Sequence, residues 1–435
     1  MNPPSSLPAS TMGRRRFLQL GSLAAAAPLI LPAKLRGAAA PSKLIHVAII
    51  GTGNIAEGHL KTLLGYPERV RIVAVCDVDR ERRDRAAALV DAAYSSRGCS
   101  SVNDFREVTR RADVDAVWVC TPDHWHALIA LDAIRHGKDA DVEKPLTFTL
   151  EEGRALVSAA REHGRVVQHG TQHRSMKRFF DAAGYVRSGG LGKLERIEVS
   201  IPPNNRFIGS SWTPEPVPAT LDWDLWLGPT PWRPYHSAGC HYNFRFIADC
   251  ANGQVANWGA HYLDIGQWAL NADDSGPIAV EGHGHFPTSG LFTCATHVDF
   301  TCHYANGIPM SCRTRQDGGG TVRFIGERGW IDIARNAMSA SSPDLLREMQ
   351  RPGKSVTLAR SDNHHENFLD CIRSRARPVA DVEIGHRTTT VCNLGQIAMT
   401  LGRKLRWDPV TESFPDDPVA NRLRGRAARS PWSLV

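Results

Sequence analysis

The chain has 435 residues, of which 42% are apolar and 22% charged, so its composition excludes a mostly disordered, collagen-like or coiled-coil protein. Its length is enough for two or three domains, and ten cysteines in a chain of this size do not indicate a disulfide scaffold. The net charge of +7 comes largely from residues 1–40, which hold basic but no acidic side chains, so we expect no nucleic-acid partner.

Residues 1–40 have the pattern of an export signal. A basic segment at residues 13–18, Gly-Arg-Arg-Arg-Phe-Leu, precedes an apolar stretch that runs to Leu31 and small residues at 38–40. The apolar stretch is shorter than the roughly 18 residues that a membrane-spanning helix needs, so it predicts a leader, with no membrane span after its removal. The twin arginines favour a Tat-type signal over an ordinary Sec leader or an uncleaved anchor. We therefore expect a periplasmic or otherwise exported protein.

Strands and helices alternate between residues 41 and 190. Strands that alternate with helices of about 10–15 residues predict parallel βαβ units, and hence an α/β Rossmann domain with a doubly wound sheet. The expected strands cover residues 45–50, 70–76, 115–120, 140–142 and 165–168, and the expected helices cover residues 54–65, 81–93, a stretch that ends at residue 136, and 151–163.

The pattern changes after Gly192 and predicts an α+β domain over residues 191–408, built on a mostly antiparallel open sheet. Asn306-Gly307 indicates a hairpin turn. The final helices are expected to return toward the first domain, and residues 409–435 to form a polar, loop-like tail. The expected elements are a strand at 193–201, an irregular aromatic segment at 202–250, a helix at 254–270, strands within 278–333, and helices at 362–375 and 386–401.

A glycine-rich turn lies between the first strand and the first helix. Asp77 follows at the end of the second strand and is expected to accept hydrogen bonds from ribose hydroxyls, which favours NAD over NADP. The glycines allow the turn and the close approach of a pyrophosphate to the helix N-terminus. Arg80, Arg82 and Arg83 could instead hold a 2′-phosphate, but we expect them on a solvated helix face. The turn matches the G-x-G-x-x-G/A pattern with Gly51, Thr52, Gly53, Asn54, Ile55 and Ala56.

Further motifs follow this turn along the chain. They are Thr121-Pro122-Asp123-His124-Trp125-His126, Gly137-Lys138, Glu143-Lys144-Pro145 and the stretch from Gly253 to Asp264. In combination, and from about residue 43 onward, the chain resembles the Gfo/Idh/MocA oxidoreductase family. The resemblance implies a catalytic Lys144 beside the nicotinamide, where an ammonium would stabilise alkoxide charge on the reacting hydroxyl. It also implies a cis peptide bond before Pro145, an Arg174 that lines the cleft, and cofactor contacts from Thr121, Pro122, His126, Glu143 and Lys144.

The same resemblance assigns a catalytic role to His261, which would accept the hydroxyl proton as hydride leaves the carbon. The family's pattern has an aspartate four residues earlier, where this chain has Asn257. Residues i and i+4 share a helix face, so Asn257 should still meet His261, although an amide cannot stabilise an imidazolium by charge. Asp264, three residues after His261, could supply that charge instead. We expect both residues in the substrate site.

The aromatic segment at 202–250 has two interpretations. Its Trp and Tyr rings could stack on a sugar, with Asn243 and Arg245 binding hydroxyl groups. The helical spacing of Trp223 and Trp226 favours core packing for these two rings instead.

The remaining histidines predict no metal site. His283 and His285 share one side of a strand but have no neighbouring cysteine or acid to complete a ligand set. His364 and His365 come at a helix start, where we expect a substrate rim or solvent.

These expectations add up to an exported NAD(P)-dependent oxidoreductase that acts on a hydroxyl of a sugar, polyol or glycoside held between Lys144 and His261. A periplasm has no free NAD pool, so the cofactor should stay bound and be recycled by paired oxidation and reduction. The alternative is a redox-assisted glycoside hydrolase or lyase that uses the same residues, and a third is a non-catalytic protein that keeps a bound dinucleotide. The resemblance suggests a homodimer or homotetramer formed through the second-domain sheet.

Overall fold

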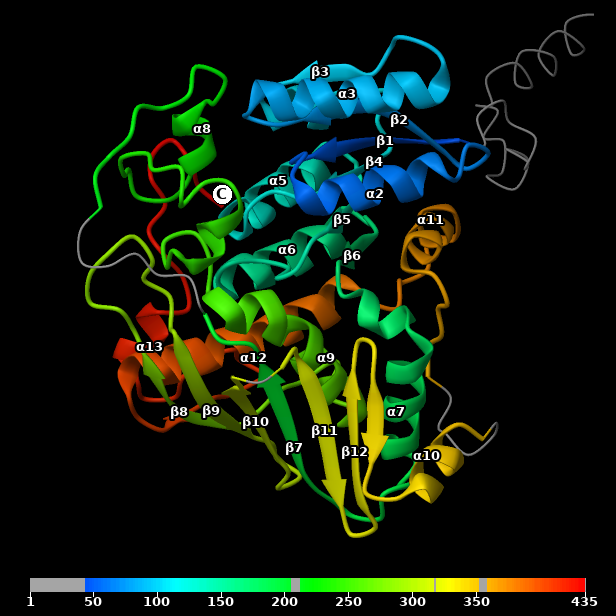
Figure 1. The fold of residues 1–435 in the computed structure, drawn as a ribbon, viewed down its shortest axis with the longest axis vertical. Coiled ribbons are helices and arrows are strands. Elements are labelled where there is room, and N and C mark those ends of the chain that lie inside the picture. The colour runs from blue at the N-terminus through cyan, green and yellow to red at the C-terminus, as the bar shows by residue number, and fades with distance from the viewer. Residues whose placement is uncertain (1–43, 205–211, 317, 352–357, 435) are drawn as a thin grey trace, which may run out of the picture. The chain divides into compact units, whose positions relative to one another are not determined.

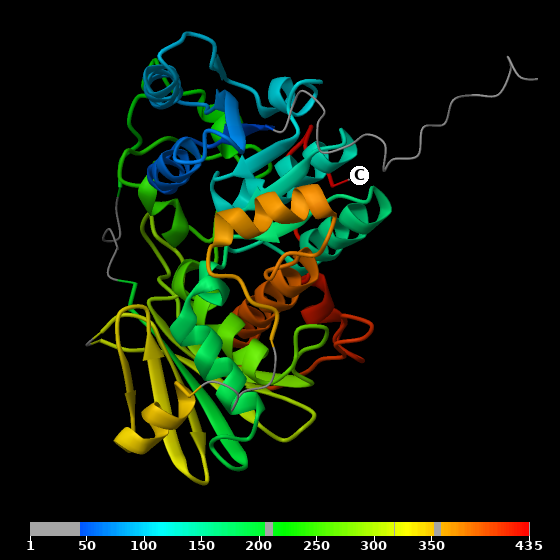
Figure 2. The ribbon, with the colours of Figure 1, turned by 90° about the vertical axis from the view of Figure 1, so that its right-hand side faces the viewer.

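The structure, a computed structural model, describes residues 44–204, 212–316, 318–351 and 358–434. The expected export signal at residues 1–40 lies outside the described residues. From β1 onward the chain first forms a parallel sheet with flanking helices, coloured blue to teal in Figure 1, and then a mixed sheet coloured green to yellow. Figure 2 shows the same two sheets from the side.

The first sheet is the predicted parallel Rossmann sheet. Within the described ranges its six strands run in the order β3-β2-β1-β4-β5-β6, and neighbouring strands are parallel throughout. Apolar cores lie on both of its faces, which explains why β1 and β4 are largely apolar along their whole length. The strands are β1 (Ile45–Ile50), β2 (Val70–Cys76), β3 (Ser100–Val102), β4 (Ala116–Val119), β5 (Asp139–Val142) and β6 (Val167–His169). The helices are α2 (Asn54–Leu64), α3 (Arg80–Tyr94), α4 (Phe105–Thr109), α5 (Asp123–Arg135) and α6 (Leu150–Glu162).

The carboxyl ends of the central strands meet at one edge of this sheet. Gly51 follows β1, Asp77 follows β2, Cys120 follows β4 and Glu143 follows β5. Open α/β sheets bind ligands in the crevice outside these ends. The topology therefore gathers the separate motifs of the first domain at one place.

The second sheet confirms the expected α+β architecture. Across the described ranges its eight strands run in the order β13-β12-β11-β7-β10-β9-β8-β14, and every neighbouring pair but β7–β10 is antiparallel. Gly307, with a φ of +81°, makes the predicted turn between β9 and β10. The strands are β7 (Leu194–Ile201), β8 (Ala279–His285), β9 (His297–His303), β10 (Pro309–Thr314), β11 (Thr321–Gly326), β12 (Gly329–Ala334), β13 (Met338–Ala340) and β14 (Leu405–Arg406).

Three helices, α7 (Lys177–Arg187), α9 (Ala260–Ala269) and α12 (Val382–Leu401), pack against the second sheet. Shorter helices are α8 (Trp223–Leu227), α10 (Pro343–Met349) and α13 (Pro418–Arg422). The helix expected at 254–270 is divided, because a π-helical turn at Val255–Gly259 precedes α9. Helix α11 (His364–Ser374) packs in the first-domain core, and α12 contributes residues to both cores.

The segment after residue 408 differs from the loop-like tail expected from its polar sequence. It contains α13, and its aromatic residues pack into the protein: Phe414 lies 4.8 Å from Trp407, and Trp432 lies 4.7 Å from Trp125 of α5, between ring centroids. The Arg429 guanidinium donates hydrogen bonds to the carbonyls of Gly228 and Asp224. Scattered aromatic and arginine side chains, rather than an apolar run, therefore anchor this segment.

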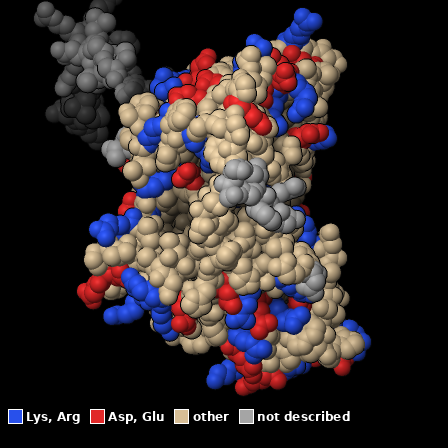
Figure 3. Space-filling model, turned by 60° about the vertical axis from the view of Figure 1, so that its left-hand side comes forward, with Lys and Arg blue, Asp and Glu red and all other residues tan. Residues whose placement is uncertain are grey.

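One face of the molecule, shown in Figure 3, carries interspersed basic and acidic side chains around a broad uncharged band. Neither sign forms a continuous patch on this face. Among the described residues, the helices are all too short or too polar to cross a membrane.

Candidate functional site

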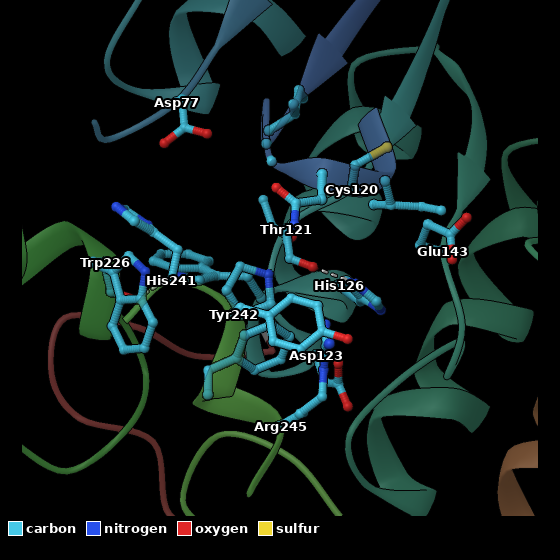
Figure 4. A pocket seen from close by; sticks show the side chains of 18 of the residues that line it. Asp77, Cys120, Thr121, Asp123, His126, Glu143, Trp226, His241, Tyr242 and Arg245 are labelled. Atoms are coloured by element: carbon cyan, nitrogen blue, oxygen red, sulfur yellow. Dashed lines mark hydrogen bonds between the residues drawn. The ribbon is translucent and has the colours of Figure 1, made fainter. Parts of the chain in front are cut away.

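A cavity of about 580 Å³ opens at the carboxyl ends of the first sheet. Its wall combines first-domain residues from the ends of β1, β2, β4 and β5 with second-domain residues from 225–226, 240–245 and 257–261. Figure 4 shows Asp77 and Glu143 on opposite sides of the group of side chains drawn, with Thr121 between them and Tyr242 and Arg245 below. The cavity therefore runs along the sheet edge and is long enough to accept an extended ligand.

The glycine-rich turn forms one end of the cavity and fits a dinucleotide. Gly51 has a φ of +86°, and a Cβ there would lie 2.7 Å from backbone atoms of Cys120 and Thr121, so only glycine is accommodated. Gly53 instead leaves an open cradle, because a Cβ there would meet only the Arg82 side chain, at 3.8 Å. Gly53, Asn54 and Ile55 all line the cavity, at the start of α2 where backbone N–H groups favour an anion.

Asp77 fixes the shape of this turn. One of its carboxylate oxygens accepts hydrogen bonds from the Thr52 backbone N–H at 2.7 Å and from the Thr52 hydroxyl at 3.0 Å. The other oxygen accepts from the Asp79 backbone N–H at 2.9 Å. The carboxylate remains on the cavity wall, as expected for a ribose-binding acid. Thr52 itself supports the turn from behind and is absent from the wall.

The arginines after Asp77 are not all on a solvated face, contrary to the sequence-based expectation. Arg82 lines the cavity, and its side chain is only 25% exposed. Arg83 donates hydrogen bonds to the Asp77 carbonyl at 3.1 Å and to Asn103 at 3.0 Å. The turn of α3 folds these two side chains back toward the end of β2.

The Thr-Pro and Glu-Lys-Pro motifs are held together by His126. Its ring nitrogens lie 2.7 Å from the Pro145 carbonyl oxygen and 2.8 Å from the Thr121 carbonyl oxygen. The Lys144-Pro145 peptide bond is cis, as the resemblance implies. His126, Thr121, Pro122, Glu143 and Lys144 all line the cavity. The two motifs therefore form a single wall.

Lys144 is half-buried, and its Nζ donates a hydrogen bond of 3.0 Å to the Asn257 side-chain oxygen. Burial lowers the pKa of Lys144, against the opposing charges of Glu143 and Asp123. The amide of Asn257 donates in turn to Gln254 at 3.0 Å, which fixes its orientation. The Asn257 side chain of the second domain is thus a well-oriented hydrogen-bond acceptor for Lys144.

Asn257 does not have the partner predicted for it. It was expected to meet His261 on a regular helix face, but it lies in the π-helical turn, which changes the spacing of side chains relative to α9. Its side chain is hydrogen-bonded to Lys144 and Gln254 instead. Asn257 remains on the cavity wall, where it positions Lys144 rather than the imidazole.

His261 lines the same cavity as Lys144 and is 4% exposed. Its ring stacks on His173 at 4.6 Å, and its Nδ1 has no hydrogen-bond partner among the described residues. Burial, followed by the charges of His173 and Lys144, lowers the pKa of His261 well below its ordinary value. The imidazole is therefore neutral near pH 7 and can act as a proton acceptor.

Arg174 and Asp264 do not line the cavity, contrary to the sequence-based expectation. Both are essentially fully buried and lie behind the cavity wall, where Arg174 donates to Asp264 at 2.8 Å and to Asp273 at 2.7 Å. Thr171 and Thr388 also donate to the Asp264 carboxylate. Because Arg174 neutralises it, Asp264 cannot supply charge to His261, and the pair instead ties α9 to the end of the first domain.

The aromatic segment supplies part of the cavity wall. The Arg245 guanidinium lies 3.8 Å from the centre of the half-exposed Tyr242 ring. Asn243 donates to the Ala238 carbonyl, and its buried side-chain oxygen has no partner in the described part of the chain. Trp226 is 3% exposed and stacks on Trp223 at 4.7 Å, in agreement with core packing, yet it also borders the cavity.

Several residues of the site lie outside the predicted set. Asp123 and Trp258 fall within motifs that were recognised, so their position could have been inferred. His241 and Arg335 come from irregular segments with no motif around them. Arg335 donates to the ring of His173 at 3.2 Å, behind His261. His364, expected at a rim or in solvent, is buried against the His169 carbonyl.

Within the described ranges there is no cluster of three or more His, Cys, Asp or Glu residues placed to hold a metal ion.

Two family models match the chain. Residues 45–171 match the NAD-binding Rossmann fold of the Gfo/Idh/MocA oxidoreductase family, and residues 206–434 match the C-terminal alpha/beta domain of that family. The second match alone covers more than half of the chain. The first domain is thus an NAD-binding Rossmann domain.

Curated relatives match over shorter stretches. A glycosyl hydrolase family 109 protein of Saccharopolyspora erythraea is 39% identical over 124 residues, which are 28% of this chain and 27% of that protein. The matched stretches span between about a quarter and a half of the first curated relatives.

Solved structures match the fold over most of the chain. The WlbA dehydrogenase from Bordetella pertussis, in complex with NADH and UDP-GlcNAcA, has a TM-score of 0.62 at 16% identity and covers 84% of this chain and 99% of its own. An aldose-aldose oxidoreductase from Caulobacter crescentus, complexed with glycerol, has a TM-score of 0.60 at 17% identity, with 83% and 99% covered. At identities this low, what the structural matches establish is a shared fold.

Proposed function

Because this chain belongs to the Gfo/Idh/MocA oxidoreductase family, we propose that it transfers hydride between a sugar, polyol or glycoside hydroxyl carbon and a tightly bound NAD. The observation that carries the proposal is the shared cavity of the glycine-rich turn, Lys144 and His261. A nicotinamide dinucleotide, when bound, supplies the hydride acceptor and donor. NADP is the less favoured cofactor, because Asp77 occupies the ribose end of the cavity.

Lys144 and His261 have different roles at the hydroxyl group: one stabilises charge and the other transfers the proton. The Lys144 ammonium, fixed by Asn257, would donate to the substrate oxygen and stabilise the negative charge that develops there. The neutral His261 would accept the hydroxyl proton in the oxidation and return it in the reduction. Burial strengthens both effects, since water does not screen the charges.

Residues Thr220–Asp222 and His241, which we call the clasp, support tight binding of the cofactor. The clasp comes from the second domain but binds the loop that carries Asp77 (α8 beside α3 in Figure 1). Arg80 N–H donates to the Thr220 carbonyl at 2.9 Å, and Asp222 N–H donates to the Val78 carbonyl at 3.0 Å. His241 Nε2 lies 2.9 Å from an Asp79 carboxylate oxygen and its side chain lines the cavity beside Asp77. His241 therefore ties the second domain to the loop that would hold the adenosine ribose.

Replacing His241 with alanine should release NAD about 10–100-fold faster than from the wild-type protein, because one hydrogen bond to a charged group contributes about 1.5–3 kcal/mol. The dissociation rate of bound NAD is measured from the nicotinamide content of protein that has passed through gel filtration. His236→Ala is the matched control, because His236 lies in the same segment but contacts Glu215. A wild-type protein that loses its NAD as fast as His241→Ala would contradict the clasp.

Redox-assisted glycoside hydrolysis or elimination is the second candidate function, favoured by the similarity to a glycosyl hydrolase family 109 protein. Oxidation of a sugar hydroxyl acidifies the neighbouring C–H, so that the glycosidic bond can break by elimination. Addition of water and return of the hydride would then restore the sugar, with no net change in NAD. Lys144 and His261 would serve in both reactions.

One experiment separates the two functions. The purified protein is incubated with aryl glycosides and, separately, with pairs of an oxidisable and a reducible sugar, and phenol release and sugar products are measured. Paired oxidation and reduction without phenol release would support the oxidoreductase. Phenol release without net NADH would favour the hydrolase or lyase, and neither product with any carbohydrate tested would contradict both.

We also propose that the twin-arginine segment at residues 13–18 exports the folded protein to the periplasm with its cofactor inside. Fractionation of cells that produce the wild type and the variant in which Arg14 and Arg15 are lysines tests this. Equal export of the two would contradict a Tat route.

We further propose that two or four copies assemble through the second-domain sheet. Its exposed face carries charge pairs such as Arg323–Asp332 and Arg313–Asp299, which offer complementary contacts to another copy. Light scattering on the purified protein would give the mass, and a strict monomer would contradict this assembly.

A further inference from the structure

A line of three hydrogen-bonded side chains leads away from the cavity behind Lys144. Glu143, on the cavity wall, has its Oε1 2.9 Å from Nε2 of His59. His59 belongs to α2, and its Nδ1 lies 2.8 Å from Nε2 of His365 in the first turn of α11. Glu143 and His59 are both less than a tenth exposed. Residues from three distant parts of the sequence therefore meet in one buried row.

The donors and acceptors in this row can be assigned. Glu143 accepts from the Lys144 backbone N–H through its second oxygen, at 3.1 Å, and its pKa leaves it ionised. Burial alone would raise the pKa of Glu143, but the hydrogen bond and charge of His59 lower it to about 2. An ionised carboxylate has no hydrogen to give, so His59 Nε2 must donate to it.

The second contact of His59 accommodates a charged ring. Burial, followed by the charges of His59 and His364, lowers the pKa of His365 to about 3, so His365 is neutral and can accept. Burial also opposes a charge on His59, but the hydrogen bond and charge of Glu143 and the charge of Asp141 outweigh it and raise the pKa of His59. A doubly protonated His59 donates to Glu143 on one side and to His365 on the other.

The surroundings of the row are built for this arrangement. The titratable groups that face His59 are Glu143 and Asp141 from β5 and His364 and His365 from α11. Gly170 leaves room for the carboxylate, because a Cβ there would lie 2.9 Å from Glu143 Cα and 3.3 Å from its Oε1. Asn363 caps α11 and accepts from the His365 backbone N–H, which holds the start of that helix in place.

We propose that His59, supported by His365, is a positioning residue that balances the charge of Glu143 and orients it on the cavity wall beside Lys144, and that loss of the His59 proton sets the alkaline limit of activity. The proposal rests on the proposed function, because it concerns the same site. Without the imidazolium, the buried carboxylate would lose the positive charge that balances it. Glu143 would then place an unbalanced negative charge on the wall next to the reacting hydroxyl, where it opposes the developing alkoxide. His59 touches neither the cavity nor the reacting atoms itself.

The test begins with the charge on His59 in the holoenzyme, measured by nitrogen NMR of labelled histidine from neutral to alkaline pH. We expect one imidazolium signal that persists above the ordinary histidine range and is missing from His59→Gln. Glu143→Gln should move its titration to lower pH, and His365→Gln should do so more weakly. A neutral His59 at neutral pH would overturn the proposal.

The second part of the test is the pH profile of kcat/KM. Loss of a partner that orients a reacting group typically costs roughly 10–100-fold, and we expect that loss for His59→Gln at neutral pH, together with disappearance of the alkaline decline. His136→Gln, on an exposed surface, should keep the wild-type profile. A purely structural role for His59 would lower thermal stability but leave the shape of the profile unchanged, which would overturn the proposal.

The two parts also separate this inference from the proposed function. If the wild-type holoenzyme acts on no carbohydrate, the proposed function fails, while the NMR titration still decides whether His59 and Glu143 form a charged pair. If turnover is normal and His59 is neutral, only the inference fails. His365→Gln, which changes the outermost member of the row, provides a milder variant should His59→Gln fold poorly.

Discussion

Replacing Lys144 with methionine should lower kcat/KM by roughly 10²–10³-fold, the usual effect of removing one preorganised donor from a developing oxyanion. Methionine keeps much of the volume of the side chain but cannot donate or carry charge. The measurement is turnover of an identified carbohydrate substrate, together with the nicotinamide content of the purified variant, so that loss of catalysis is distinguished from loss of cofactor.

The pH profile of turnover provides a second test of the role of Lys144. Burial lowers the pKa of Lys144, so the wild-type protein should lose the lysine charge at a pH below the ordinary lysine value, as a step separate from the decline that His59 sets. The methionine variant should lack the lysine step and keep the decline set by His59. Lys61→Met is the matched control, because Lys61 is exposed on α2 and pairs with Glu57. Undiminished turnover by Lys144→Met would exclude the proposed mechanism, and a bound dinucleotide without turnover in the wild type would favour the non-catalytic alternative.

Replacing His261 with glutamine should lower kcat/KM in the oxidative direction by roughly 10²–10⁴-fold, the range for removal of a general base. Glutamine retains polarity but cannot take up the proton. Because burial lowers the pKa of His261 well below 6.5, the wild-type rate should rise with pH only in the acidic range and be level through neutrality. The variant should lose this acidic rise. His285→Gln, on an exposed position of β8, serves as the control. An acidic rise that persists in His261→Gln would assign the base to another group.

The fold was predictable because its signals are local. Strand and helix periodicity located the Rossmann elements, and parallel strands place Gly51, Asp77 and Glu143 at one edge whatever the details of packing. The second-domain sheet followed from alternation and from Asn306-Gly307. Such patterns depend on neighbours within a few residues, so the sequence displays them directly.

The errors at the site share a different origin. Asp264 was assigned to His261 by helix spacing, but its partner is Arg174, 90 residues away. Asn257 was assigned by the same spacing, which a π-helical turn alters. Tertiary packing decides which residue pairs with a buried charge, so the partner cannot be identified from the sequence around that charge. His59 was overlooked for the same reason, and His365 was expected at a substrate rim or in solvent, whereas it contacts His59.

The last segment of the fold has a consequence for the order in which the protein matures. Arg426 donates to the His124 carbonyl, 302 positions earlier, and Trp432 packs on Trp125, in the helix that carries part of the cavity wall. A nascent chain therefore cannot finish the wall until these residues have left the ribosome.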